Sequence, residues 1–193
     1  MIEEISQKTT SKWSGGTTTE IYKYPPSAAF LSADFQYRFS LAEIIEENSV
    51  FTKIPTVKRT FFLLKGKVEL RHENHHQSVL LANEQDHFDG DWNTVCQGKG
   101  TVFNLMTRPD ISSTISHFKL KANEKMKLTE TQHGELVFIY LADGQIKASD
   151  NSQTIMMKQN SFIRLSETAI DLHALEASRL IITKITSPSP TKK

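Results

Sequence analysis

The sequence has a single cysteine, Cys96, and no apolar run near the length of a membrane-spanning helix. One cysteine forms no disulfide within the chain and cannot supply a thiolate-rich zinc site. A spanning helix needs about 20 consecutive apolar residues, and the start of the chain lacks the basic and apolar regions of a secretion signal. We therefore expect neither membrane insertion nor secretion, and a cytoplasmic location.

The sequence also lacks an excess of charge of one sign. Its 23 basic and 22 acidic residues give a formal net charge of +1. Nucleic acids and anionic membrane surfaces are bound chiefly through clustered positive charge, so neither is expected as a partner. A small molecule or another protein fits this composition better.

Short runs of β-branched and aromatic residues recur along the chain, with turn signals such as Lys65-Gly66 and Asp143-Gly144 between them. The clearest runs are residues 37–41, 60–64, 101–106, 136–141 and 179–185. Many short strands with frequent turns predict an all-β protein. Little helix is expected, and residues 43–48 are the best short candidate.

The two halves of the chain resemble each other in the order and spacing of these runs, which indicates a duplicated β-lobe. The aligned pairs are 64–70 with 142–148, 79–81 with 155–157, Phe88 with Phe162, and 102–105 with 180–183. One hairpin per lobe is expected, at Gly66 and Gly144. Pro109 interrupts strand pairing, so we predict lobes at residues 1–108 and 109–186, followed by a disordered tail at 187–193.

Five motifs follow one another in the first lobe. Residues 13–21 have the sequence Trp-Ser-Gly-Gly-Thr-Thr-Thr-Glu-Ile, and four more motifs occur at 37–42, 51–59, 88–91 and 103–106. This set resembles the HutD/Ves family. The resemblance implies a double-stranded β-helix bicupin, meaning two cupin-like jelly-roll β-barrel lobes of the RmlC-like superfamily. It also implies a link to histidine utilisation or stress response, as a regulator or small-molecule sensor with no firmly attached reaction.

The first lobe lacks the metal ligands of a catalytic cupin. Counting back from Gly66 puts Arg59 where such cupins have a glutamate, and Lys53 and Pro55 where they have a histidine pair. Imidazole and carboxylate ligands are required there, so neither a metal nor another cofactor is expected. The same count in the second lobe finds only His133, and one histidine cannot hold a metal alone.

Arg59 at that position suggests a different kind of ligand. A guanidinium is permanently charged, and its planar fork suits a carboxylate or phosphate. With Arg38 expected on a neighbouring strand, the sequence predicts a site for a small anionic, carboxylate-type ligand. An alternative stays open, in which the two arginines lie on the surface or pair with Glu20, Glu43 or Asp89 and merely tie strands together.

The opening motif supports two interpretations. Gly15 and Gly16 permit backbone conformations that bring N–H groups close to an anion, and Thr17 adds a hydroxyl. The same glycines would equally shape a turn that closes the barrel, with Trp13 as a plug. The further candidates are Ser40 and an inward-facing, hydrogen-bonded Asn104 for hydrogen bonds, and Trp13 and Met106 for the cavity wall.

Two positions depart from the resemblance. The family commonly has aspartate where this sequence has Lys58 and Val102. If those carboxylates belong to a ligand site, its polarity has changed here.

One group of histidines lies close together in the sequence. The spacing of His72, His75 and His76 suits a transition metal. The run 71–77 is polar throughout and follows a predicted strand, which favours a solvated loop instead.

Three functional hypotheses follow. The leading one is a non-catalytic bicupin that binds a small anion and acts as a sensor or regulator of metabolism. The second is an enzyme, an isomerase or hydrolase acting on a small organic acid, either metal-free or with a metal at His133 or the His72 group. The third is a structural or interaction module that associates through sheet edges, for example as a homodimer.

Overall fold

The structure is a computed structural model and describes residues 1–6, 8–129 and 134–186. The predicted all-β class is confirmed, because the regular secondary structure of these residues consists of strands without any helix. The described residues therefore include no helical segment with the length and hydrophobicity that crossing a membrane requires. His133 and the predicted tail at 187–193 lie outside the described residues.

The chain forms two compact units. The first unit spans Gln7–Pro109, and the second combines Met1–Ser6 with Asp110–Lys193. The sequence predicts a first lobe at residues 1–108, which includes residues 1–6. They lie in the second unit because strand β1 (Ile2–Glu4) pairs with strand β15 (Phe162–Ser166).

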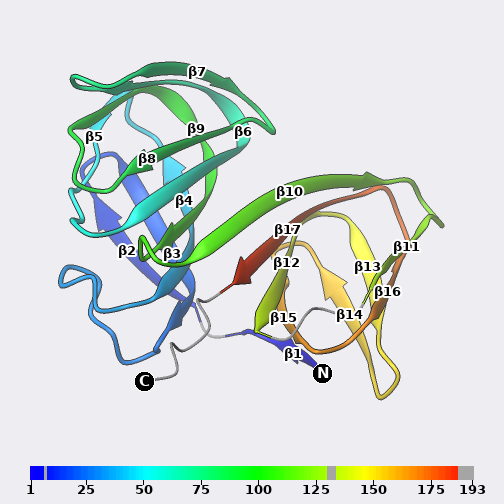
Figure 1. Cartoon of the computed structure of the whole chain (residues 1–193). Coiled ribbons are helices and arrows are strands. Elements are labelled where there is room, and N and C mark those ends of the chain that lie inside the picture. The colour runs from blue at the N-terminus through cyan, green and yellow to red at the C-terminus, as the bar shows by residue number, and fades with distance from the viewer. Residues whose placement is uncertain (7, 130–133, 187–193) are drawn as a thin grey trace, which may run out of the picture. The chain divides into compact units, whose positions relative to one another are not determined.

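The first unit is built on one antiparallel sheet (Figure 1). Its strands are β2 (Thr9–Trp13), β3 (Gly16–Tyr24), β4 (Tyr37–Ile44), β5 (Asn48–Val50), β6 (Lys58–His72), β7 (Gln77–Leu81), β8 (Gln85–Asp89) and β9 (Thr94–Thr107). The order is β2-β3-β4-β9-β6-β7, with β5 beside β9 and β8 beside β6. The long strands β6 and β9 pair with each other over almost their whole length.

The second unit has two sheets. Besides β1 and β15, its strands are β10 (Ser112–Leu120), β11 (Lys125–Leu128), β12 (Glu135–Asp143), β13 (Gln145–Ser149), β14 (Thr154–Lys158), β16 (Ile170–Ala174) and β17 (Ser178–Thr186). The five-stranded sheet has the order β1-β15-β12-β17-β10, and the four-stranded sheet has the order β11-β16-β13-β14. Buried side chains such as Ile139, Leu172 and Leu180 form its core.

The order of strand pairing in the first unit is repeated in the second. Strands β4, β9, β6 and β8 neighbour one another as β10, β17, β12 and β15 do. Strands β5, β9, β6 and β7 correspond in the same way to β11, β16, β13 and β14. This repetition is the arrangement that a duplicated β-lobe requires.

Gly66 and Gly144 are not the hairpin turns that the sequence predicts. Gly66 lies inside β6, with φ +103°, and a Cβ there would clash with the carbonyl oxygen of Lys99 on β9. Gly144, with φ +93°, joins β12 to β13, which belong to different sheets. Both glycines permit a bend where the chain closely approaches another strand.

The predicted helix at residues 43–48 is wrong. Strand β4 continues to Ile44, and β5 begins at Asn48. Between them, the backbone N–H groups of Ile45 and Glu46 donate to the carbonyl oxygen of Gly15, at 2.9 and 3.3 Å. Tertiary hydrogen bonding thus overrides the local helix preference of this glutamate-rich segment.

Candidate functional site

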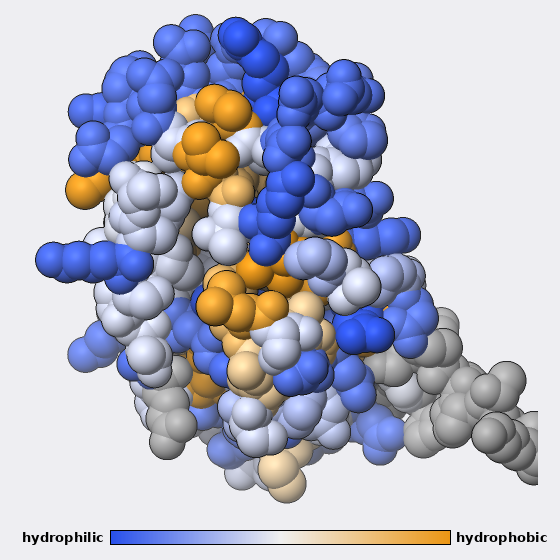
Figure 2. Space-filling view, turned by 90° about the vertical axis from the view of Figure 1, so that its left-hand side faces the viewer, coloured by the Kyte–Doolittle hydropathy of each residue, from blue (hydrophilic) through white to orange (hydrophobic). Residues whose placement is uncertain are grey.

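The first unit contains a cavity of about 530 Å³ that is open to solvent on one side. Its lining comes from strands β2, β3, β4, β6 and β9 and from the segments that contain Phe30 and Phe51. Figure 2 shows hydrophobic side chains recessed between hydrophilic ones in the upper part of one face. The volume suits a small molecule.

Two rows of cross-strand neighbours on β4, β9 and β6 form one wall of the cavity. The first row is Arg38, Met106 and Arg59, and the second is Ser40, Asn104 and Phe61. Residues two apart on a strand face the same side of a sheet, so both rows project toward the cavity. Trp13, from the end of β2, also lines it.

The other three predicted ligand-binding residues are Gly15, Gly16 and Thr17, and the cavity lining does not include them. Gly16 has φ +152° in the β2–β3 hairpin, and a Cβ there would clash with the carbonyl oxygen of Glu43. A Cβ at Gly15 would clash with the Trp13 ring. The glycines thus shape the turn that lets Trp13 and the neighbouring chain pack closely.

Strand β3 contributes three lining residues that the sequence reasoning did not assign to the site: Thr18, Glu20 and Lys23. Thr18 and Glu20 follow the usual alternation of a strand. A β-bulge between Glu20 and Tyr22 then inserts one residue and brings Lys23 to the same side. The alternation places Thr17 on the opposite side of the strand.

Arg38 is a compensated charge. Its Nε donates to Glu20 Oε2 at 2.7 Å and its Nη1 to Ser40 Oγ at 3.2 Å, while Lys23 Nζ lies 3.1 Å from Glu20 Oε1. Burial opposes ionisation of Glu20, but the hydrogen bonds from Arg38 and Lys23 outweigh it and lower the pKa of this carboxyl. The pairing with Glu20 that the sequence left open is therefore present for Arg38.

Arg59 is a buried charge without a counterion among the described residues. Its relative exposure is 7%, and its Nε has no hydrogen-bond acceptor there. The guanidinium carbon lies 5.1 Å from the Phe51 ring centre and 4.9 Å from that of Phe88. Burial, together with the charge of Arg38, lowers the pKa of Arg59 to about 10, so the side chain stays cationic at neutral pH.

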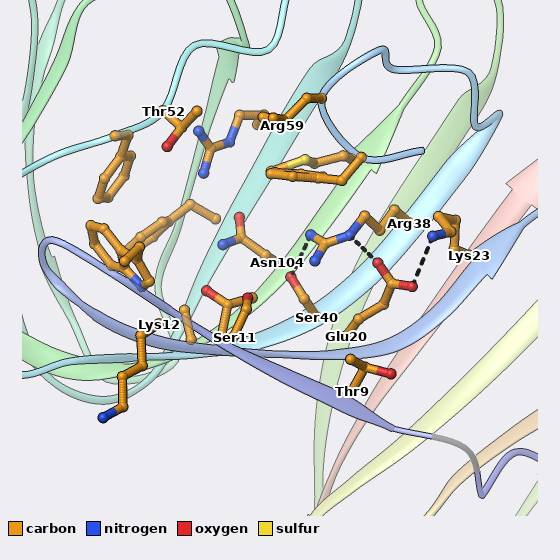
Figure 3. Close-up of a pocket in the computed structure, with 18 of the residues that line it drawn as sticks. Thr9, Ser11, Lys12, Glu20, Lys23, Arg38, Ser40, Thr52, Arg59 and Asn104 are labelled. Atoms are coloured by element: carbon orange, nitrogen blue, oxygen red, sulfur yellow. Dashed lines mark hydrogen bonds and ion pairs between the residues drawn. The ribbon is translucent and has the colours of Figure 1, made fainter. Parts of the chain in front are cut away.

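Two further cavity residues have buried polar atoms without a partner in the described part of the chain, namely Trp13 Nε1 and Asn104 Oδ1. The prediction that Asn104 is hydrogen-bonded is therefore wrong for its amide oxygen. Figure 3 shows the guanidinium groups of Arg38 and Arg59 and the amide of Asn104 directed toward the same space. Buried polar groups normally have partners, so this space is suited to a polar ligand.

The charged residues of the lining are mostly cations. Among the described lining residues, Lys12, Lys23, Arg38 and Arg59 are basic, and Glu20 is the single acidic residue. Figure 3 shows the Lys12 side chain extending away from the other labelled groups, so the arginines set the charge of the interior. Apolar walls come from Trp13, Phe30, Phe51, Phe61 and Met106.

The two positions that depart from the family pattern do not line the cavity. Lys58 is exposed, and Val102 is fully buried in the core of the first unit. Neither change alters the polarity of the cavity wall.

The residues do not fit a metal at the usual cupin position. The buried guanidinium of Arg59 lies at the position that the sequence count matches to a metal ligand, and the lining residues that the structure describes include no histidine or cysteine. Glu20, the one carboxylate among these lining residues, is held in ion pairs. A cation at this point would repel a metal ion instead of binding it.

Comparison with solved structures shows the cupin fold. The chain resembles a conserved protein of unknown function, PA5104 from Pseudomonas aeruginosa PAO1, with 17% identity and a TM-score of 0.80 over 97% of this chain and 100% of that one. HutD from Pseudomonas fluorescens SBW25 matches with 18% identity and a TM-score of 0.69, over 98% and 100%. A cupin 2 conserved barrel domain protein from Leptotrichia buccalis matches with 11% identity and a TM-score of 0.58, over 92% and 91%.

The search of curated proteins found no match to the chain. The protein-family model described as HutD matches residues 6–182, which include nearly all of both units. This match confirms the resemblance that the motifs of the first lobe indicate. The chain belongs to the HutD family.

Proposed function

We propose that this protein is a non-catalytic cupin that binds a small organic anion in the cavity of its first unit and acts as a sensor or regulator of metabolism. The observation that carries the proposal is the buried guanidinium of Arg59, which has no counterion among the described residues and whose Nε lacks an acceptor there. Leaving a charge buried without a partner costs about 1–3 kcal/mol or more. A ligand carboxylate would remove this cost on binding and could accept two parallel hydrogen bonds.

The surrounding groups narrow the class of ligand. The charge of Arg38 acts on Arg59, and Trp13 Nε1 is a buried donor without an acceptor among the described residues. Asn104 Oδ1 requires a donor, which a ligand N–H or O–H would provide. The aromatic walls favour an apolar or planar body, so the proposed ligand is a small carboxylic acid that also has a hydrogen-bond donor.

The lining supports binding more than catalysis. Its described residues include neither a histidine nor a cysteine, and Ser40 Oγ accepts a hydrogen bond from the cation of Arg38. Glu20 is tied to Arg38 and Lys23, so it is not a free general base. The family's link to histidine utilisation makes the acids of histidine degradation the first ligands to try.

The test is a thermal-shift and calorimetric screen of small mono- and dicarboxylates, including those acids, against the wild type and Arg59→Lys. A ligand at about 100 times its Kd should stabilise the wild type by roughly 2.7 kcal/mol. Arg59→Lys keeps the charge but loses the bidentate fork, so affinity should fall at least about tenfold.

Lys58→Gln is the matched control, because Lys58 is exposed on the same strand and lies outside the cavity. Its affinity should equal that of the wild type. The proposal fails if no acid binds the folded wild type, or if Arg59→Lys and Lys58→Gln bind equally well.

A further inference from the structure

A second group of polar side chains lies in the first unit, away from the cavity. His72 is the last residue of β6, His76 lies in the turn before β7, and Asp86 belongs to β8. The His72 side chain is fully buried, the Asp86 side chain is 10% exposed and the His76 side chain is 41% exposed. The prediction of a solvated loop is therefore wrong for His72.

The potential ligand atoms of these three residues converge. His72 Nε2 lies 3.1 Å from Asp86 Oδ2, and His76 Nε2 lies 2.9 Å from Asp86 Oδ1. All three ligand atoms lie within 4.8 Å of one another. A cation that binds at about 2.0–2.2 Å from each ligand needs this kind of spacing, after small side-chain adjustments.

The neighbouring groups hold the ligands in place. His72 Nδ1 is 2.8 Å from Thr94 Oγ1, which is buried, so the Nε2 atom is turned toward Asp86. Asp86 accepts hydrogen bonds from Ser78 Oγ and from the backbone N–H of His87. Such outer contacts fix the ring and carboxylate orientations of metal ligands.

The group is separate from the anion cavity. None of its three residues lines that cavity. The Phe88 ring contacts both sites, since it lies 4.5 Å from the His72 ring and 4.9 Å from the guanidinium carbon of Arg59. Phe88 therefore contacts both His72 of the histidine group and Arg59 of the cavity wall.

We propose that His72, His76 and Asp86 bind one divalent transition-metal ion of the zinc or nickel type. Two imidazole nitrogens and one carboxylate oxygen suit such a borderline cation. Because His76 is partly exposed, water can complete the coordination. The bound ion ties the β6–β7 turn to β8 and thereby stabilises the first unit.

The test uses the full-length protein without a histidine tag, after treatment with a chelator that is then removed. Zn²⁺ is titrated calorimetrically, and Co²⁺ is added to give a visible spectrum that reports nitrogen and oxygen ligation. The wild type should bind one ion per chain and show a higher melting temperature with zinc. His76→Gln should bind at least about tenfold more weakly, because glutamine keeps a donor for Asp86 but provides no imidazole.

His75→Gln is the matched control. His75 is also exposed in the turn, but its ring stacks on Trp92 at 3.7 Å and belongs to no ligand group. Zinc affinity and the cobalt spectrum should match those of the wild type. Equal loss in His75→Gln and His76→Gln would show adventitious capture by surface histidines, and the absence of stoichiometric binding to the folded wild type would equally overturn the proposal.

Arg59→Lys separates this proposal from the proposed function. This variant should keep the zinc affinity of the wild type, because Arg59 provides no ligand to the metal. A wild type that binds zinc but no organic acid would support the metal site while removing the anion proposal, and the reverse result would do the opposite.

Discussion

Arg38 and Arg59 lie in the same row of the cavity wall, on either side of Met106, and their neighbours give them different energetic roles. Arg38 is paired with Glu20 and Ser40, whereas Arg59 is buried against two aromatic rings without an acceptor for its Nε among the described residues. Cation–π contacts contribute about 0.5–2 kcal/mol and do not replace the hydration that a buried guanidinium loses. Arg59 should therefore reduce the stability of the ligand-free protein.

This difference predicts opposite effects of one substitution at the two positions. Arg59→Met keeps much of the side-chain volume and removes the unpaired charge, so the free energy of unfolding should rise by about 1–3 kcal/mol in the absence of ligand. Arg38→Met leaves Glu20 with only Lys23 as a partner. Since the Glu20 side chain is 25% exposed, a loss of about 1–2 kcal/mol is expected.

Urea unfolding of both variants, in buffer without carboxylates, measures these changes. A loss of stability in Arg59→Met as large as that in Arg38→Met would mean that the charge of Arg59 is already compensated in the free protein.

The sequence predicted the chemical character of the site better than the full set of residues that line it. Arg38, Ser40, Asn104 and Met106 were placed by motif order, and the strand register brings all of them to the cavity. The sequence cannot show which threonine of the run 17–19 faces the cavity, because Thr17 and Thr18 are chemically equivalent. Only the register of β3 against β4 decides which side of the sheet each side chain is on.

The sequence singled out His72 as a potential metal ligand but did not predict that it is a buried strand residue. Because its sequence neighbours are polar, the local pattern does not indicate that β6 continues to His72. The burial of the His72 ring depends on Phe88 and Trp92, which are distant in sequence. A histidine in a polar run has no local signal that separates a strand end from a loop.

At the scale of elements, the repeat predicted from the sequence has its counterpart in the strand pairing, although the details differ. With Gly66 matched to Gly144, the pair Arg59 and Phe88 in the first unit corresponds to Val137 and Leu165 in the second. The order and spacing of the sequence runs match Phe88 with Phe162 instead, so the sequence alignment is three residues out of register here. The second unit thus has an apolar core pair where the first unit has its charged site.

The backbone conformation of Gly66 in β6 predicts that a side chain at this position is destabilising. Gly66→Ala would force a side chain into positive φ and against the backbone of Lys99 and Gly100, so the free energy of unfolding should fall by about 3 kcal/mol. Gly134→Ala is the control, because Gly134 also has positive φ, +81°, but nothing lies within 4 Å of a Cβ there. It should lose only about 1 kcal/mol.

Chemical denaturation measures the free energy of unfolding of both alanine variants. The comparison shows whether β6 needs glycine because of the positive φ or because a side chain would clash with β9. Equal losses would show that the close approach to β9 contributes nothing beyond the backbone conformation.

At the scale of the whole molecule, the two candidate sites lie in one unit. All the described residues that line the cavity, and all three residues of the histidine group, belong to the first unit. The second unit has a well-packed apolar core to which the first residues of the chain contribute, since Ile2 is 3% exposed and packs with Val137 and Leu165. The sequence could not assign this short segment, because three strand residues next to a binding motif carry no signal for a partner more than 150 positions away.

This division predicts that stability and ligand binding respond separately to a change at the start of the chain. Ile2→Ala should lower the free energy of unfolding by about 2–4 kcal/mol, because it removes buried apolar volume from the second unit. Under native conditions the affinity for an anion should not change, since the described residues that line the cavity all belong to the first unit. Glu4→Ala, on the exposed part of the same strand, should change stability by less than about 0.5 kcal/mol. If Ile2→Ala unfolded like the control in urea, the packing of the Ile2 side chain in this core would contribute nothing in solution, and if it weakened anion binding in calorimetry, the cavity would depend on the second unit.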